Sequence, residues 1–277
     1  WPWQWHQWQH LVIILVLGGL LAFQFTMASA IPTIDRYFDG VNHADYVYAL
    51  DEESWINESR LNQLKNNPDD IEEFDFIDEI TGRLFWKTSL SLTGEEDKRY
   101  FLLIGLDANE TWPDVYNYTI AEGKNFNEVK GNKSAVIDKV FAEKNDIDLQ
   151  DKIEIDGLNN KTIKISGKCN APEFLATTSN PEFLFPIQGS LGVVYLKQAT
   201  LKDYIVDYYN DSRKPYLAAY FNETDYNNLA ITFKEGIDPE KASHKLEEYL
   251  KDEWDIGIEN AEAFEDSFAY NYMKEDV

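Results

Sequence analysis

The sequence predicts an α+β protein made of one N-terminal transmembrane helix and a β-α-β domain that is split by an inserted small β-rich subdomain. Three observations predict this architecture. Residues 11–31 form a long uncharged apolar run. A β-α-β pattern occurs near each end of the remaining chain, and short strands and turns fill the middle. Two β-α-β patterns around a β insertion are typical of one α+β unit interrupted by a second subdomain.

The apolar run reads LVIILVLGGLLAFQFTMASAI, and it contains no charged residue. A hydrocarbon core of about 30 Å needs about 20 helical residues, so this run is long enough to span a bilayer. The tryptophans at positions 1, 3, 5 and 8 suit the headgroup region. The alternative is a cleaved signal peptide with residues 27–30 (MASA) at its cleavage site. Residues 1–10 lack the basic start of a signal peptide, which favours a retained helix.

The composition limits the classes of partner. The formal net charge of the 277 residues is −25, which disfavours binding to nucleic acid or to anionic lipid headgroups. Solubility, or adaptation to high salt or low pH, is the simplest reading of this acidity. Cys169 is the single cysteine, so no intramolecular disulfide can form, and a buried structural thiol is its expected role.

Asn-x-Ser/Thr sequons, the acceptors of N-linked glycans, are frequent. Roughly two would be expected by chance from the residue frequencies, whereas the chain contains seven. Their abundance agrees with a large domain that faces away from the cytoplasm. The predicted candidates are Asn57, Asn109, Asn117, Asn132, Asn160, Asn210 and Asn222.

The first part of the chain reads as β-α-β-β-β. Alternating apolar residues predict a strand at 44–50, and helical spacing predicts a helix over 54–66 with Ser54 as its cap. Thr81-Gly82 is read as a turn between two strands, 71–80 and 83–92. The apolar segment 100–106 is then a buried strand.

The middle and the end of the chain also contain predicted strands and helices. A change of composition at 110–118 marks a subdomain boundary, after which we expect a small, mostly β unit. Asp238 and Pro239 predict the start of a helix that continues to about residue 251, between strands at 228–234 and 256–263. The elements expected in the middle are strands at 134–137, 152–155, 161–165 and 192–196, and helices at 138–145 and 200–209.

A series of short motifs resembles a known family. The motifs are GKNF at 123–126, SAVI at 134–137, DLQDKI at 148–153 and ITFKEGIDPE at 231–240. Their order and spacing, behind a transmembrane helix, resemble the extracytoplasmic core domain of MacB/FtsX-like ABC transporter permeases. The resemblance covers most of residues 11–277. Gln150-Asp151 departs from it, because family members commonly carry Gly-Asp there.

The resemblance implies a porter-like subdomain that is interrupted by an inserted β-rich subdomain. The implied parts are an N-terminal segment with the transmembrane helix (1–34), the first porter-like half (35–112), the insertion (113–223) and the second porter-like half (224–277). It also implies two or three further membrane helices, which are not in this sequence. We therefore expect a fragment of a permease or a reduced relative with a single anchor.

The function implied by the resemblance is transport. The domain would couple cytoplasmic ATP hydrolysis to movement of an external body that acts on an exported or lipid-associated substrate. The implied partners are a cytoplasmic ABC ATPase subunit, a second permease chain and the membrane, with no nucleic acid. The expected location is the cell membrane of a prokaryote, with the large domain outside. The alternative is a single-pass surface-anchored binding or sensor module without energy coupling.

Enzyme chemistry is not indicated, and we predict no catalytic, cofactor-binding or metal-binding residue. The four histidines lack zinc-site spacing, and neither a nucleophile elbow nor a phosphate-binding loop occurs. A carboxylate-dependent hydrolase is a distant third hypothesis. The acidic residues between 146 and 156 could bind calcium, although they lack the spacing of an EF-hand. The alternative is that they lie on solvated turns. Ligand contact is an alternative to packing for the aromatic residues Trp112, Tyr116, Tyr118, Tyr208, Tyr209, Tyr216, Tyr220 and Phe221.

Overall fold

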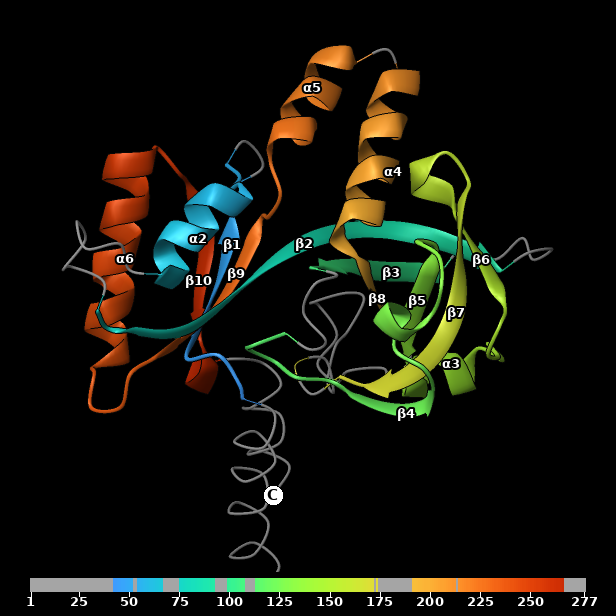
Figure 1. The fold of residues 1–277 in the computed structure, drawn as a ribbon, viewed down its shortest axis with the longest axis horizontal. Helices are drawn as coiled ribbons and strands as arrows, with labels where there is room; N and C mark the ends of the chain where they lie inside the picture. The colour runs from blue at the N-terminus through green and yellow to red at the C-terminus, as the bar shows by residue number, and fades with distance from the viewer. Residues whose placement is uncertain are drawn as a thin grey trace, which may run out of the picture.

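The structure, a computed structural model, contains two units joined by one long strand (Figure 1). It describes residues 42–51, 54–66, 75–92, 99–107, 113–171, 173, 191–212 and 214–266. The predicted transmembrane helix at 11–31 lies outside these residues. Among the helices that are described, none has the length and apolar character needed to cross a membrane.

The first unit is a four-stranded antiparallel sheet with two helices on one face, and we call it the split-βαβ unit. Its strands lie in the order β10-β1-β9-β2. The chain order β-α-β followed by β-α-β with this strand order is a ferredoxin-like topology. Its elements are β1 (Tyr46–Leu50), α2 (Glu58–Asn66), the first half of β2 (Ile77–Leu92), β9 (Asn228–Phe233), α6 (Pro239–Trp254) and β10 (Ile258–Ala263).

The second unit is a closed ring of six strands. Pairing runs from β2 through β3, β8, β5 and β7 to β6, and β6 pairs again with β2. A closed sheet leaves fewer unpaired backbone groups at its edges. The short strand β4 (Thr119–Gly123) pairs with β7 outside the ring. The other ring strands are β3 (Arg99–Leu106), β5 (Ser134–Asp138), β6 (Lys152–Ile155), β7 (Lys161–Asn170) and β8 (Leu191–Lys197).

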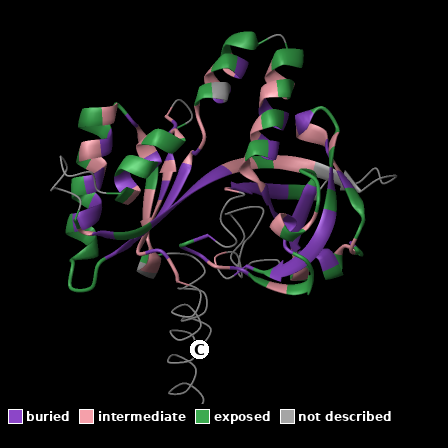
Figure 2. Ribbon diagram, in the orientation of Figure 1, coloured by how far each residue is buried: buried purple, intermediate pink, exposed green. Residues whose placement is uncertain are grey.

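Alternation along the strands sends side chains to two separate cores. Phe101 and Leu103 of β3 belong to one buried cluster, whereas Leu102 and Ile104 belong to another. The two clusters lie on opposite faces because successive residues of a strand point to opposite sides. Helix α4 (Gln198–Asp211) adds Leu201 to the first cluster, and α5 (Pro215–Glu223) packs beside α4. Figure 2 shows buried residues along these strands.

The predicted turn at Thr81-Gly82 is wrong, because β2 is one strand of 16 residues that passes through both units. Gly82 pairs with Leu229 in the sheet. A Cβ at Gly82 would lie 2.6 Å from Leu61 Cδ2 and 2.9 Å from Tyr226 Cγ. The glycine therefore serves close packing of α2 on the strand, and the sequence pattern Thr-Gly imitates a turn.

We expect Gly82→Ala to lower the free energy of unfolding by about 1–3 kcal/mol, because overpacking forces neighbouring side chains from their rotamers. Leu61 is buried, so its side chain has little room to move. Urea denaturation followed by tryptophan fluorescence measures the change. A variant as stable as the parent would show that α2 shifts freely, which would contradict the close packing described above.

The remaining predicted elements are largely confirmed, with one cap corrected. Helix α2 begins at Glu58, and the Oδ1 atom of Asn57 accepts a hydrogen bond from the Arg60 N–H, so Asn57 is the cap. Ser54, the predicted cap, instead accepts a hydrogen bond from the Gly257 N–H at 2.7 Å. Asp238 caps α6 as predicted. The sequence pattern does not predict β4 and α5, since neither shows a clear apolar period.

The predicted boundary at 112/113 groups β3 with the first half of the split domain. In the structure the strand partners change within β2, because Arg83 pairs with Asn228 of β9 and Leu84 pairs with Gly105 of β3. β3 also pairs with β8 along its whole length. The pairing therefore changes at residues 83/84, well before the predicted boundary. The second predicted boundary, at 223/224, falls between α5 and β9.

Asp138 caps the short helix α3 (Lys139–Lys144), accepting a hydrogen bond from the Phe141 N–H. Burial raises the pKa of this carboxyl group above its usual value. A raised folded-state pKa stabilises the fold at low pH, and that contribution is lost as pH rises through the raised value. We expect Asp138→Asn, which keeps a capping oxygen, to be more stable than the parent at pH 7. The difference should shrink towards pH 3, as measured by urea denaturation at both pH values; an equal difference at both would contradict the burial effect.

Candidate functional site: the base and the junction

Both ends of the described fold meet at one place, which we call the base (residues 42–45 and 264–266). The rings of His43 and Phe264 have their centroids 3.8 Å apart. The Asp45 carbonyl accepts a hydrogen bond from the Phe264 N–H at 2.9 Å. The Asp45 carboxylate accepts another from the Phe233 N–H at 2.6 Å. The first and last described segments are therefore fixed to β9 and to each other.

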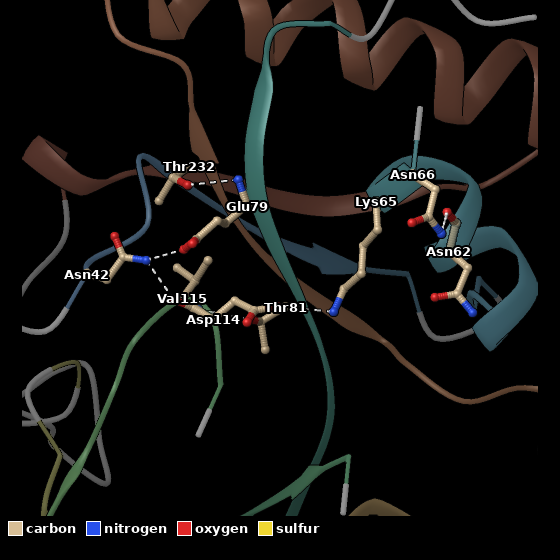
Figure 3. Close-up of polar contacts among 9 residues, drawn as sticks. All are labelled: Asn42, Asn62, Lys65, Asn66, Glu79, Thr81, Asp114, Val115 and Thr232. Carbon is tan, nitrogen blue, oxygen red and sulfur yellow. Dashed lines mark hydrogen bonds and ion pairs between the residues drawn. The ribbon is translucent and has the colours of Figure 1, made fainter. Parts of the chain in front are cut away.

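Asn42 connects the base to β2 and to the segment that follows β3 (Figure 3). Its Nδ2 donates to the Glu79 carboxylate and, at 2.6 Å, to the Asp114 carbonyl. Its own carbonyl accepts a hydrogen bond from the Tyr116 N–H at 2.8 Å. Asn42 and Tyr116 both have a positive φ, of 48° and 59°. Asparagine tolerates this left-handed conformation better than most residues do, which suits the local turn.

Residues 113–116 lie across the face of the split-βαβ sheet that carries no helix. The Thr81 hydroxyl accepts a hydrogen bond from the Val115 N–H at 2.9 Å, and Lys65 pairs with the Asp114 carboxylate at 3.3 Å. Val115 and Tyr116 also share a small buried cluster with Ala44 and Ala230. These contacts hold the base, β2 and the entrance of the ring together.

The two units join at a second group of residues, which we call the junction (Arg83, Phe85, Asp225, Asn227 and Asn228). The side chain of Asn227 pairs with the main chain of Phe85 in the manner of a β-ladder. Its Oδ1 accepts from the Phe85 N–H at 2.7 Å, and its Nδ2 donates to the Phe85 carbonyl at 3.0 Å. The ladder between β9 and β2 is thus extended by one side chain at the place where β2 leaves β9.

Arg83 places a buried cation at the junction, and its side chain is 3% exposed. Its Nε donates to Asn228 Oδ1 at 2.7 Å, and Nη1 forms an ion pair with Glu173. The rings of Phe85 and Tyr116 lie 4.7 and 5.5 Å from its guanidinium carbon. Within the described part of the chain, Nη2 is buried without a hydrogen-bond partner. A buried charge is costly unless it is paired, so these contacts are needed to hold the guanidinium.

Asp225 links helix α2 of the first unit to helix α4 of the second. Its carboxylate accepts from the Glu58 N–H at 2.8 Å, at the start of α2. It also accepts from Lys202 Nζ at 2.6 Å and from Gln198 Nε2 at 3.3 Å, both on α4. The ion pair with Lys202 is partly exposed, with both side chains at 21%. The junction therefore contains contacts between strands and contacts between helices.

A cavity of about 590 Å³ opens beside the base. Its wall includes the carboxylates of Asp45, Asp238, Glu240 and Asp266. Two of these carboxylates already have partners. Asp45 accepts a hydrogen bond from the Phe233 N–H, and Asp238 caps α6 and forms an ion pair with Lys241 at 2.7 Å. The hydrogen bond from Lys241 lowers the pKa of Asp238. No group of three or more potential ligands suited to a metal ion occurs among the residues that the structure describes.

The structure separates the aromatic residues that the sequence grouped together. Tyr116 and Tyr118 are buried beside β2 and β8, and Tyr118 stacks on Tyr195. Phe221 packs with Tyr209 against the ring, and Tyr216 is 69% exposed. Trp112 lies outside the described residues. Packing accounts for most of this set, so the residues do not form one ligand surface.

The predicted sequons and the acidic turn are also scattered. Asn132, Asn160 and Asn210 are exposed, whereas Asn57 and Asn117 are half-buried. Asn109 lies outside the described residues, and so does the side chain of Asn222. In the acidic turn at 146–156, Asp148 lies 3.7 Å from the nitrogen of the buried Lys168. Cys169 is buried, as its predicted structural role requires.

No sequence motif indicated the base or the junction. Asn227 is a single polar residue just before β9, Arg83 lies within β2, and their roles depend on partners more than 80 positions away in the sequence. The strand that contains Arg83 also carries Asp78, Glu79 and Lys87, so the sequence does not mark Arg83 as the buried cation. Arginine is almost never fully buried unless it is paired, and only the structure shows the partners.

Comparisons with known proteins identify a family and similar solved structures. A family model described as the MacB-like periplasmic core domain matches residues 11–249. Among solved structures, the periplasmic region of MacB from Actinobacillus actinomycetemcomitans is 12% identical, with 88% of this chain and 99% of that chain covered and a TM-score of 0.45. The extracellular domain of the noncanonic ABC-type transporter YknZ from Gram-positive bacteria is 13% identical, with 78% and 99% covered and a TM-score of 0.43.

A search of curated proteins finds no match. The family model nevertheless reaches both units, from before β1 into α6, and it includes the junction and residues 42–45 of the base. With most of its length matched in this way, the chain belongs to the family of MacB-like periplasmic core domains.

Proposed function

We propose that this domain passes movement of the membrane helices of an ABC transporter permease to the six-stranded ring outside the membrane. The observation that carries the proposal is the base, where the tilted rings of His43 and Phe264 are in contact and the Asp45 carbonyl accepts a hydrogen bond from the Phe264 N–H. Displacement of either segment is transmitted to the other there. The membership of the MacB-like family supplies the transporter context.

The path from the base to the ring is short and continuous. Asn42 binds Glu79 on β2, and β2, a strand of 16 residues, continues from there into the ring. At the junction, Asn227 and Arg83 hold β2 to β9 where the strand changes partner. A strand that is hydrogen-bonded in both units moves as one piece with them. The ring is thus a rigid lever, and the switching occurs in the membrane part that nucleotide state biases.

In this proposal the chain performs no catalysis of its own. A cytoplasmic ABC ATPase subunit hydrolyses ATP, and a second permease chain completes the transporter in the cell membrane. The domain lies outside the cytoplasm, where its ring acts on an exported or lipid-associated substrate. Nucleic acid is not a partner, in keeping with the net charge of −25.

The test is a pair of distances in the assembled transporter, measured by double electron–electron resonance. Cysteines replace Lys164 on the ring and Glu248 on α6, both of which are exposed, and the buried Cys169 does not take up the label. We expect the distance between 164 and 248 within one chain to stay constant when a nonhydrolysable ATP analogue binds. The distance between the two copies of residue 164 should change.

Two outcomes would contradict the proposal. If the distance between the two copies is the same with and without nucleotide, energy coupling is absent, as in a surface-anchored sensor. If the distance within one chain changes, the domain bends at the junction, and the ring is not a rigid lever. Labels on Glu248 and on Asn260 of β10 provide the matched control, because both residues lie in the split-βαβ unit.

A further inference from the structure

The sequons differ in whether a glycan-transferring enzyme can reach them. Asn57 is half-buried, and its Oδ1 accepts a hydrogen bond as the cap of α2. The Oδ1 of Asn117 is buried. Asn132 is exposed, but its sequon hydroxyl belongs to Ser134, which is 6% exposed in β5. Transfer needs an accessible amide and an accessible hydroxyl residue two positions later, so these three sequons are poorly placed.

Asn160 and Asn210 meet both conditions. Asn160 lies in the turn before β7 with a φ of 55°, and both it and Thr162 are exposed. Asn210 lies in the last turn of α4, and both it and Ser212 are exposed. Within the part of the chain that the structure describes, neither asparagine amide is engaged in a hydrogen bond. Their amides are therefore available without loss of a structural contact.

The two sequons lie at one corner of the molecule. The Nδ2 of Asn159 donates to the Asp211 carboxylate at 2.9 Å, and Lys161 pairs with Asp207 at 2.6 Å. These two links fix the turn before β7 against the last turns of α4. Chain segments some 50 positions apart thus bring two exposed acceptor amides to the same place, beside the hairpin that α4 and α5 form (Figure 1).

We propose that Asn160 and Asn210 carry N-linked oligosaccharides. The Nδ2 atom attacks the anomeric carbon of an oligosaccharide that is bound to a lipid phosphate or pyrophosphate. A C–N bond forms, the C–O bond to the phosphate breaks, the lipid phosphate leaves, and the amide loses one proton. The structure adds to the sequence pattern a choice of two sites among the five sequons whose asparagine side chains it describes, and it places them together.

The proposed glycans have a structural consequence. Two oligosaccharides at this corner cover the end of α4 and the turn before β7 and keep other proteins away from them. The opposite side of the ring, at β4, remains uncovered. Glycosylation requires that the domain lies outside the cytoplasm, but it does not require energy coupling. Absence of the glycans would therefore not contradict the proposed transmission of movement, and absence of that movement would not contradict the glycans.

The test is glycopeptide mass spectrometry on the full-length protein purified from the membranes of the cells that make it. We expect sugar on the peptides that contain Asn160 and Asn210, and none on those that contain Asn57 and Asn117. Thr162→Ala and Ser212→Ala should each remove the sugar from one site while keeping the asparagine. Ser59→Ala and Thr119→Ala, which destroy the other two sequons, should leave the total sugar mass unchanged.

These exposed substitutions keep all buried contacts, so loss of folding does not obscure the result. Circular dichroism of each variant confirms that the fold is retained. An unmodified amide at Asn160 or at Asn210 in the native protein overturns the proposal. Sugar on Asn57 or Asn117 overturns it equally, because it would show that accessibility in the folded domain does not select the sites.

Discussion

Arg83→Met is expected to lower the free energy of unfolding by about 3–5 kcal/mol, the loss typical of breaking a buried ion pair. The substitution removes the partner of Glu173, whose side chain is 15% exposed. It also leaves Asn228 Oδ1 without its donor and removes the cation from between the rings of Phe85 and Tyr116. Methionine fills a similar volume, so the loss measures charge and hydrogen bonding rather than a cavity.

Urea denaturation at pH 7 measures the effect, with Arg60→Met as the matched control. Arg60 is half-buried on α2, where it lies 5.4 Å from the Trp254 ring and makes a long contact of 3.4 Å to the Trp254 carbonyl. The control should lose less than about 1 kcal/mol. If both variants lost the same amount, the junction would have no special dependence on Arg83. If Arg83→Met were more stable than the parent, the free energy lost by desolvating the ion pair would exceed the free energy gained from its contacts.

Asn227→Ala is expected to lower the free energy of unfolding by about 2–4 kcal/mol, because it leaves two main-chain groups of Phe85 without partners. The Phe85 N–H and carbonyl both bind the Asn227 amide. Asn227→Asp keeps an acceptor for the N–H but presents a carboxylate to the carbonyl, so a loss that is smaller than that of alanine is expected. Asn260→Ala, at an exposed position of β10, should change stability by less than about 0.5 kcal/mol.

The Asn227 series also tests the lever. In Asn227→Ala, β2 keeps its main-chain ladder to β9 and the Arg83–Asn228 hydrogen bond but loses the two hydrogen bonds at Phe85, so the two units are less firmly joined. The distance distribution between labels at 164 and 248 should broaden while the control distribution between 248 and 260 stays narrow. If both distributions stay unchanged in a destabilised variant, Asn227 contributes to stability without holding the two units in register.

Local signals were enough for most individual elements. Asp238-Pro239 predicted the start of α6, because an Asp cap and a proline at the first helical position act within a few residues. The segment 138–145 is likewise expected to be helical, and α3 occupies Lys139–Lys144 of it. Thr81-Gly82 misled the prediction, because the residues that make a turn also suit a close approach between a strand and a helix. Only the position of Leu61 and Tyr226 distinguishes the two cases.

The amino-acid sequence by itself determined the α+β class, the two β-α-β patterns around a β-rich insertion and the family resemblance, because these depend on local periodicity and on ordered motifs. The tertiary structure alone decided that β2 is shared by both units, that the ring closes through β6, and that His43 meets Phe264. It also decided which sequons stay exposed. Each of these depends on contacts between residues far apart in the chain, and a buried charge such as Arg83 shows its purpose only when its partners are in place.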